Sequence, residues 1–516
     1  MSSIKRIYFF LFSYEVYLFL LLCIAAFLPL AKIVISVGAI AVSAHWLFAP
    51  NLKDRVQIYF ANKIALVATV TFILFAIGLL YSSDLAYGLK DIRLKLPLLC
   101  FPIVLSSHYR IRKKHFNWML LLFITGTLFS TLYSYLVYNG LAPAKKEINE
   151  IRDISQFLSH IRLSLMIVLC LFIIPILSRK TIAKKILGLI TFLWLSYFLS
   201  IIESGTGLII GISTLFFIVL YLLFNKRKLF ALLPLIVLIA FISIISYKLA
   251  STYQNVKYKP QEENQLTSLG NTYDSTAVFK FFDNGNFSNQ YFCEEELKKG
   301  WEELSDKPYI APYSVVLIRY LTSKGYKKDY QGINKLSRKD IQNIENGIPN
   351  YLQAENSLIS RLYELMFEID GFLSGASPEG NSLSQRLVYW KVGKEIGQEK
   401  IWFGYGTGDV QKAFQKHYAE NDIISKKYQL RSHNQYLSTF ISLGIVGVFF
   451  FLLSLTIPVQ YSIKKRNYFH IVFSSIALLS FISEDTLENQ TGVFFFAFFN
   501  ALFLFQTPKA FLNKHV

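Results

Sequence analysis

Long apolar runs separated by short polar turns cover most of the chain. One helical crossing of a bilayer needs about 20 apolar residues, so this pattern predicts an all-α polytopic membrane protein with about twelve transmembrane helices. The predicted spans are 8–29, 31–49, 63–81, 96–107, 116–138, 161–178, 186–202, 207–224, 229–248, 434–459, 467–483 and 491–507.

The fourth predicted span differs from the others. The segment from Leu96 to Ser107 is short and contains Pro97 and Pro102. Proline removes a backbone donor and kinks or breaks a helix interior. The sequence leaves open whether this segment crosses fully or is broken or re-entrant, and without it every later span would change direction.

One long polar stretch interrupts the apolar runs, from about 249 to 432, and it is long enough to form a small domain. We therefore expect three parts: membrane helices 1 to 9 in 1–248, a mostly helical loop domain in 249–432, and helices 10 to 12 with a tail in 433–516.

Inside the loop, apolar residues at helical spacing predict an amphipathic helix over Asn356–Asp370. A second helix is expected over Ser382–Gly397, with Leu387, Trp390 and Ile396 facing inward. A third is expected to start at Asp409, after the glycine-rich turn 404–408. The region 255–350 has mixed short patterns, and we assign no element to it.

The distribution of charge predicts the orientation. The formal net charge is +19, but the basic residues lie in short clusters between apolar runs, which argues against a nucleic-acid partner. With the N-terminus inside, the inner segments carry 21 Lys and Arg against the single acid Asp54, whereas the short outer loops carry seven basic residues and nine acids. The positive-inside rule then predicts that both termini are cytoplasmic and that the large loop is outside, in the periplasm.

A titratable ring precedes the tenth predicted span. The segment Arg431 to Tyr436 leads into an apolar run that carries Gly444 and Gly447. If the helix starts near His433, Gly444 lies about three turns on, so the three residues share one helix face. Such a glycine pair lets a neighbouring membrane helix approach closely and would fix the position of the histidine. The alternative is a packing glycine pair beside a chance histidine.

The order of residues His433, Asn434, nine residues, Gly444, two residues and Gly447 resembles the signature of the O-antigen ligase and polymerase family of bacterial envelope enzymes. Further segments resemble Bacteroidetes-type members in the same order along the chain. These are Ser159–Arg162, Cys293–Leu297, Leu317–Leu321, Gln385–Trp390, Gly404–Asp409 and Glu484–Glu488.

The resemblance implies a GT-C-type membrane glycosyltransferase of the bacterial inner membrane. The resemblance also implies that the enzyme transfers an undecaprenyl-diphosphate-linked glycan to an acceptor at the periplasmic face. Transfer of O-antigen to lipid A core is the preferred reaction. The alternatives within the family are an O-antigen polymerase and a protein O-oligosaccharyltransferase. A transporter of lipid-linked glycans is the remoter alternative, since the internal repeats common in transporters are not seen in this sequence.

Two histidines lie at the expected outer membrane boundary. Unperturbed histidine titrates near pH 6.5, which suits a general base that takes a proton from a sugar hydroxyl. His433 carries the family motif and is our candidate catalytic base. His160 starts the sixth span and is expected at the donor diphosphate site, where capping or orienting is preferred over catalysis, whereas His417 is expected on a solvated surface.

Arginines complete the predicted site, because a planar guanidinium donates paired hydrogen bonds to a diphosphate leaving group. Arg162 enters an apolar span two residues after His160, and Arg386 matches the family's loop arginine before a tryptophan. We predict catalytic roles for both. Snorkelling to the headgroups is the alternative for Arg162, and a loop salt bridge is the alternative for Arg386. Arg431 and Arg319 are expected to bind the donor diphosphate.

The remaining candidates are acids and glycines. Glu484, Asp485 and Glu488 are expected to form an outer acidic cluster that contacts sugar hydroxyls or orients His433, and ordinary outer-loop acids are the alternative. The glycines of 404–408 are expected to form a turn, with a backbone nest for a phosphate oxygen as the other interpretation. Spacings typical of metal ligands are not seen in this sequence, so we expect no metal and no cofactor, in line with the metal-independent transfer that the resemblance implies.

Overall fold

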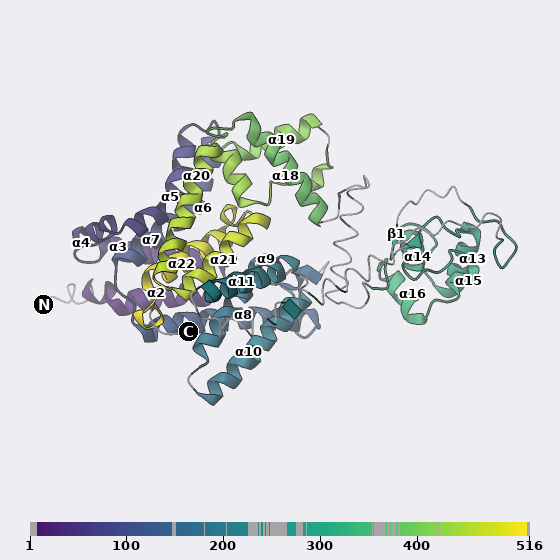
Figure 1. Ribbon diagram of the computed structural model, residues 1–516, viewed down its shortest axis with the longest axis horizontal. Helices are drawn as coiled ribbons and strands as arrows, with labels where there is room; N and C mark the ends of the chain where they lie inside the picture. The colour runs from purple at the N-terminus through teal and green to yellow at the C-terminus, as the bar shows by residue number, and fades with distance from the viewer. Residues whose placement is uncertain are drawn as a thin grey trace. The chain divides into compact units, whose positions relative to one another are not determined.

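The computed structural model (Figure 1) describes residues 8–146, 151–179, 181–202, 204–224, 266–274, 282–352 and 382–512, apart from positions 285 and 422, together with isolated positions between these ranges. The chain divides into two compact units. The first comprises Met1–Ala231 and Gln385–Val516, and the second comprises Leu232–Ser384.

Helices account for most of the described part of the first unit. In chain order they are α2 Tyr14–Phe27, α3 Lys32–Phe48, α4 Leu52–Ala61, α5 Lys63–Leu80, α6 Leu85–Lys95, α7 Pro97–Ser107, α8 Lys113–Tyr138, α9 His160–Leu177, α10 Ile182–Ile201, α11 Gly205–Phe224, α18 Ser382–Glu399, α19 Val410–Asn421, α20 Gln435–Lys464, α21 Tyr468–Ser483, α22 Gln490–Gln506 and α23 Lys509–Leu512.

Seven helices of the described part of the chain are long and apolar enough to cross a membrane, and the pair α3 and α4, bent by 108°, makes an eighth if it counts as one span. The prediction of a helical, polytopic membrane body is therefore confirmed. Helices α21 and α22 are also apolar but shorter. The predicted span 229–248 lies mostly outside the described residues, so the count of twelve stays a prediction. The seven helices are Tyr8–Phe27, Lys63–Leu80, Lys113–Tyr138, His160–Leu177, Ile182–Ile201, Gly205–Leu223 and Gln435–Lys464.

The fourth predicted span forms the short helix α7. Its 11 residues extend about 16 Å, roughly half of a 30 Å hydrocarbon core. Pro97 stands at the first turn of the helix, where a missing N–H costs nothing. The helix packs against α5 and α22, and its buried face includes Phe101 and Leu105. We conclude that α7 does not cross the bilayer by itself.

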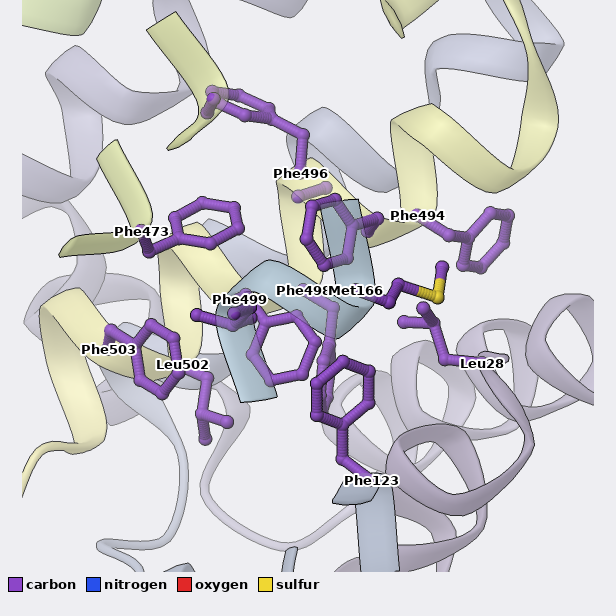
Figure 2. Close-up of a cluster of buried hydrophobic side chains, with 14 of the residues drawn as sticks. Leu28, Phe123, Met166, Phe473, Phe494, Phe496, Phe498, Phe499, Leu502 and Phe503 are labelled. Carbon is purple, nitrogen blue, oxygen red and sulfur yellow. The ribbon is translucent and has the colours of Figure 1, made fainter. Parts of the chain in front are cut away.

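The centre of the first unit is α22, whose aromatic side chains point in several directions (Figure 2). A helix that is apolar all round is expected to be surrounded by protein or lipid. The Phe499 ring lies 4.6 Å from that of Phe123 on α8, and the Phe498 ring lies 5.4 Å from that of Phe101 on α7. Helix α22 thus joins α7 and α8, and it follows directly on the acidic turn that enters the candidate site.

The second unit has its own small core. The antiparallel strands β1 (Phe282–Asp283) and β2 (Asn286–Phe287) precede four helices: α13 Glu294–Leu304, α14 Tyr313–Ser323, α15 Tyr330–Ile333 and α16 Arg338–Glu345. Trp301, Leu317 and Ile344 are buried between them. These elements lie in the region 255–350, to which the sequence analysis assigned no structure.

The three loop helices predicted from the sequence have different outcomes. The helix expected over Asn356–Asp370 lies mostly outside the described residues. The helix expected over Ser382–Gly397 is confirmed as α18, but its inward face carries Val388, Tyr389, Val392 and Ile396, while Leu387 and Trp390 are half-buried. Helix α19 begins at Val410, directly after the expected start at Asp409.

Asp340 fixes the start of α16. Its carboxylate accepts hydrogen bonds from the Ser337 N–H (2.9 Å), the Tyr320 hydroxyl (2.7 Å) and Lys324 Nζ (2.7 Å). Burial would raise the pKa of Asp340, but hydrogen bonds from Lys324, Tyr320 and Ser337 outweigh it and lower this pKa to about 2.

The ionised form of Asp340 therefore stabilises the fold above pH 4, and this contribution is lost as the pH falls toward 2. We expect Asp340→Asn to speed amide hydrogen exchange in 313–345 at pH 7. The difference from wild type should shrink steadily below pH 4. Hydrogen-exchange mass spectrometry of the full chain measures these rates. If the variant differs from wild type as much at pH 2.5 as at pH 7, the role given to the ionised Asp340 is wrong.

Candidate active site at the start of α20

Helix α20 is broken in its first third. Gly444 has φ +64° and ψ −169°, outside the helical region. A Cβ atom at this position would lie 2.3 Å from the backbone carbonyl of Trp402. The prediction that His433, Gly444 and Gly447 share one face of a continuous helix is therefore wrong, because His433 precedes the helix and Gly444 interrupts it.

The segment from Ile401 to Gly406 fills the break. The N–H of Ile445 donates to the Ile401 carbonyl (2.8 Å), and the N–H of Gly406 donates to the Ser442 carbonyl (2.8 Å). Two similar bonds join Val446 to Trp402 and Tyr405 to Ile441. Irregular backbone at membrane depth requires such partners inside the protein. The loop before α19 is thus attached to the first part of α20.

The same loop is anchored to the end of α5. The N–H of Thr407 donates to the Gly78 carbonyl (3.1 Å), and that of Gly408 donates to Ser82 Oγ (2.9 Å). The carboxylate of Asp409 accepts from the Ser83 N–H and the Asp84 N–H at 2.6 and 2.9 Å. Since the amides of this turn are used within the protein, the interpretation of 404–408 as a nest for phosphate is wrong, and the turn holds α5 and α20 together.

Substitution of Gly444 tests this arrangement. We expect Gly444→Ala to destabilise the protein by at least about 2 kcal/mol, because alanine disfavours positive φ by roughly 1–2 kcal/mol and its methyl group would displace Trp402. Gly205→Ala is the matched control, since a Cβ there meets nothing within 4 Å. Thermal unfolding in detergent measures both variants, and equal melting temperatures would contradict the role given to Gly444.

His433 lies in the turn just before α20. Its φ of +47° is left-handed, a conformation that histidine adopts more readily than most residues other than glycine. Asn434 follows as the N-cap, and its side-chain oxygen accepts from the Leu437 N–H at 3.0 Å. The imidazole is half-buried, and its centroid lies 5.7 Å from the Tyr389 ring of α18. The His-Asn pair therefore ends one segment and begins the helix, with the imidazole beside α18.

Arg162 and Arg386 contact the same carboxylate. Arg162, in the first turn of α9, lies 3.2 Å from Glu484 Oε2, and Arg386, the fifth residue of α18, lies 3.0 Å from Glu484 Oε1. Glu484 is 2% exposed, whereas each arginine side chain is about one-fifth exposed. A buried carboxylate thus holds together two accessible guanidinium groups from distant parts of the chain.

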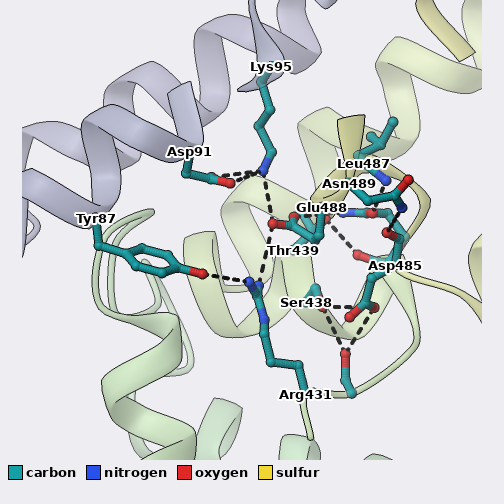
Figure 3. Close-up of polar contacts among 12 residues, drawn as sticks. Tyr87, Asp91, Lys95, Arg431, Ser438, Thr439, Asp485, Leu487, Glu488 and Asn489 are labelled. Carbon is teal, nitrogen blue, oxygen red and sulfur yellow. Dashed lines mark hydrogen bonds and ion pairs between the residues drawn. The ribbon is translucent and has the colours of Figure 1, made fainter. Parts of the chain in front are cut away.

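A second ionic cluster surrounds Glu488 (Figure 3). Glu488 Oε2 lies 2.9 Å from Lys95 Nζ and 3.5 Å from an Arg431 guanidinium nitrogen. Lys95 also contacts Asp91 at 2.7 Å, and Arg431 donates to the Tyr87 hydroxyl at 3.3 Å. Lys95 is fully buried. The cluster connects α6 to the segment that carries His433.

The acids in and beside the two clusters differ in their pKa. Burial would raise the pKa of Glu488, but Lys95 and Arg431 outweigh it and lower this pKa to about 2. Burial dominates at Asp91 and raises its pKa to about 6. Burial also raises the pKa of Asp485, against the opposing effects of Arg431 and His433. Glu488 is therefore the firmly charged acid, and Asp485 lies within electrostatic range of His433.

Within the first unit, the structure brings together most of the residues predicted from the sequence, and the remaining one is Arg319. Its guanidinium lies in the second unit and forms a bidentate pair with the buried Asp283 at 3.0 and 3.1 Å. His160 begins α9, two residues before Arg162, and Gly447 lies within α20 beyond the break. The predicted sugar contacts of Glu484 and Glu488 stay untested, and both carboxylates have cationic partners.

Three residues of the second cluster were not predicted. Tyr87, Asp91 and Lys95 are spaced four residues apart, which places them along one face of α6. This spacing was visible in the sequence, but the segment was interpreted as part of an outer loop.

About half of the chain matches a known protein family. A family model described as O-antigen ligase matches residues 190–452. The matched range contains Arg386, the 404–408 turn and the start of α20, while Arg162 and Glu484 lie outside it. No curated protein matches the chain.

Proposed function

The chain belongs to the O-antigen ligase family, and on this premise we propose that it transfers an undecaprenyl-diphosphate-linked glycan to an acceptor hydroxyl. Activity of the ligase or polymerase type follows from the family. Transfer of O-antigen to lipid A core is the reaction we propose. Polymerisation, with a second lipid-linked repeat as acceptor, uses the same bond-forming step.

The observation that carries this proposal is the convergence of Arg162 and Arg386 on Glu484. Glu484 occupies one nitrogen of each guanidinium, and each guanidinium has further N–H donors. These donors suit the oxygens of a diphosphate, on which charge builds as the glycosidic bond to it breaks. Glu484 is the positioning residue that keeps the two guanidinium groups side by side.

His433 is the proposed general base. Its imidazole takes the proton of the acceptor hydroxyl as the acceptor oxygen attacks the anomeric carbon of the donor. The bond from that carbon to the diphosphate oxygen breaks, and undecaprenyl diphosphate leaves with the bonding electron pair. Because attack and departure occur on opposite sides, the configuration inverts. Asp485 lies near enough to stabilise the imidazolium that forms.

Arg431 has a supporting role in this proposal. It is held by Glu488 at 3.5 Å and stands two residues before His433. Its position favours a contact with the donor diphosphate. The Glu488 cluster holds the turn that carries His433 in a fixed position relative to α6. We place the site at the periplasmic face of the inner membrane, with both termini in the cytoplasm, from the charge distribution of the loops.

A transfer assay tests the function. Membranes that contain the protein are supplied with lipid-linked glycan and rough lipopolysaccharide, with and without a chelator. We expect glycan on the lipid A core, equally in both samples. Longer lipid-linked glycan without any transfer to core would identify a polymerase instead. A requirement for a nucleotide sugar or a divalent metal would contradict the proposed chemistry.

A further inference from the structure

A groove of about 680 Å³ lies between α3, α6, α7 and α22, away from the residues assigned above. We call it the α3/α6 groove. Much of its lining is apolar and comes from α3 and α22, and it includes Ala39, Ile40, Ala44, Leu47, Phe48 and Phe494. A volume of this size is typical of a site for a small molecule or part of a lipid.

Two cations also line the groove. Lys90 and Arg93 are exposed residues of α6, and neither forms an ion pair with any residue that the structure describes. The neighbouring polar residues are Ser36 and Gln490, which are joined by a 2.5 Å hydrogen bond. The polar residues and the apolar lining together match the two parts of a lipid, a charged headgroup and a hydrocarbon chain.

The dimensions agree with this chemistry. The lining of α3 extends from Ser36 to Phe48, about 18 Å of helix, which is slightly more than half of a 30 Å hydrocarbon core. On this wall of the groove, Lys90 and Arg93 belong to α6, whereas Pro97 and Cys100 belong to α7, so the cations lie toward the α6 part of the wall. An acyl chain that extends through one leaflet therefore has about the right length to fill the groove.

We propose that the α3/α6 groove binds a phospholipid with an anionic headgroup, whose phosphate pairs with Lys90 and Arg93 and whose acyl chain covers the apolar lining. Lys and Arg side chains near the membrane surface attract anionic lipid headgroups. A substrate diphosphate is the less suitable occupant. At 100° per residue, the mean direction of Lys90 and Arg93 lies roughly 130° from the mean direction of Tyr87, Asp91 and Lys95, the face of α6 that contacts the Arg431 and Glu488 cluster.

Native mass spectrometry in detergent tests the proposal without any activity assay. The full chain is titrated with phosphatidylglycerol and with phosphatidylethanolamine of the same acyl chains. Wild type should bind phosphatidylglycerol about tenfold more tightly. Lys90→Gln with Arg93→Gln should remove this preference, and Lys184→Gln with Lys185→Gln, at exposed positions of α10, should keep it.

A second variant tests the apolar part of the groove. Ala44→Phe should weaken binding of both lipids, with thermal unfolding as the check that the fold is kept. The proposal is overturned if wild type binds the two lipids equally, or if the Lys90 and Arg93 variant retains the preference. Displacement of bound phosphatidylglycerol by an equimolar polyprenyl diphosphate would also overturn it and would assign the groove to the donor.

Discussion

His433→Asn is expected to lower the rate of glycan transfer by about 10²- to 10⁴-fold, the contribution of a positioned general base. Asparagine tolerates the left-handed backbone at this position, where φ is +47°, so the turn before α20 should keep its shape. The variant removes the imidazole and leaves the neighbouring arginines in place. Initial rates in the membrane assay, normalised to protein level, measure the effect.

The matched control for this prediction is His417→Asn. His417 lies on α19 and contacts Glu395 at 3.2 Å, outside the residues that surround Glu484 and Glu488. Its replacement should leave transfer within about twofold of wild type. If His433→Asn keeps more than one-tenth of the wild-type rate at normal abundance, His433 is a structural residue of the turn and the general base lies elsewhere.

Glu488→Gln is expected to have the largest effect on stability. It leaves the fully buried Lys95 with Asp91 as its remaining ionic partner and takes the carboxylate away from Arg431. Removal of one partner from a buried ion pair costs up to about 3–5 kcal/mol, and here Asp91 still compensates part of the Lys95 charge while Arg431 loses its carboxylate. Thermal unfolding in detergent should show a clear fall in melting temperature. Glu420→Gln, at an exposed pair with Lys416, should change it little.

A second substitution separates the ionic effect from a loss of packing. In the background of Glu488→Gln, Lys95→Met removes the buried ammonium group, which has lost one of its two carboxylate partners, and should restore part of the lost stability. If the loss of stability in the double variant equals the sum of the losses in the two single variants, Lys95 and Glu488 are not coupled. The assignment of Lys95 to the Glu488 cluster is then wrong.

The parts of the fold that the sequence predicted well depend on local patterns. Apolar runs of about 20 residues identified the long membrane helices, because backbone groups in a bilayer must be satisfied within the helix. Helix α18 followed from helical periodicity and α19 from a capping residue after a glycine turn. Each signal is contained in a few consecutive residues.

The break in α20 could not be predicted in this way. A glycine pair in an apolar run indicates close helix packing. The same sequence pattern also occurs where one of the glycines interrupts the helix. The difference lies in the segment Ile401–Gly406, which supplies the missing hydrogen bonds from a distant part of the chain. Only the folded arrangement shows that Gly404, Gly406 and Gly444 belong to a single junction.

The candidate site was predictable in its residue types but not in its pairings. The family resemblance named His433, Arg162 and Arg386, and the acids of 484–488 were recognised as a group. That Glu484 joins two arginines, and that Glu488 joins Arg431 to Lys95, depends on how α6, α9 and α18 meet the turn before α22. Lys95 was missed because a polar segment of 11 residues resembles a loop by composition.

Binding of undecaprenyl diphosphate tests most directly the claim that Arg162 and Arg386 form a diphosphate site. The affinity is compared for wild type, Arg162→Gln, Arg386→Gln and the double variant. Lys391→Gln, an exposed position of α18, is the control. Each arginine variant should bind at least about tenfold more weakly, the value of one charge-assisted hydrogen bond. The control should bind like wild type. Wild-type affinity in the double variant would show that these arginines only anchor Glu484, and the proposed donor site would be wrong.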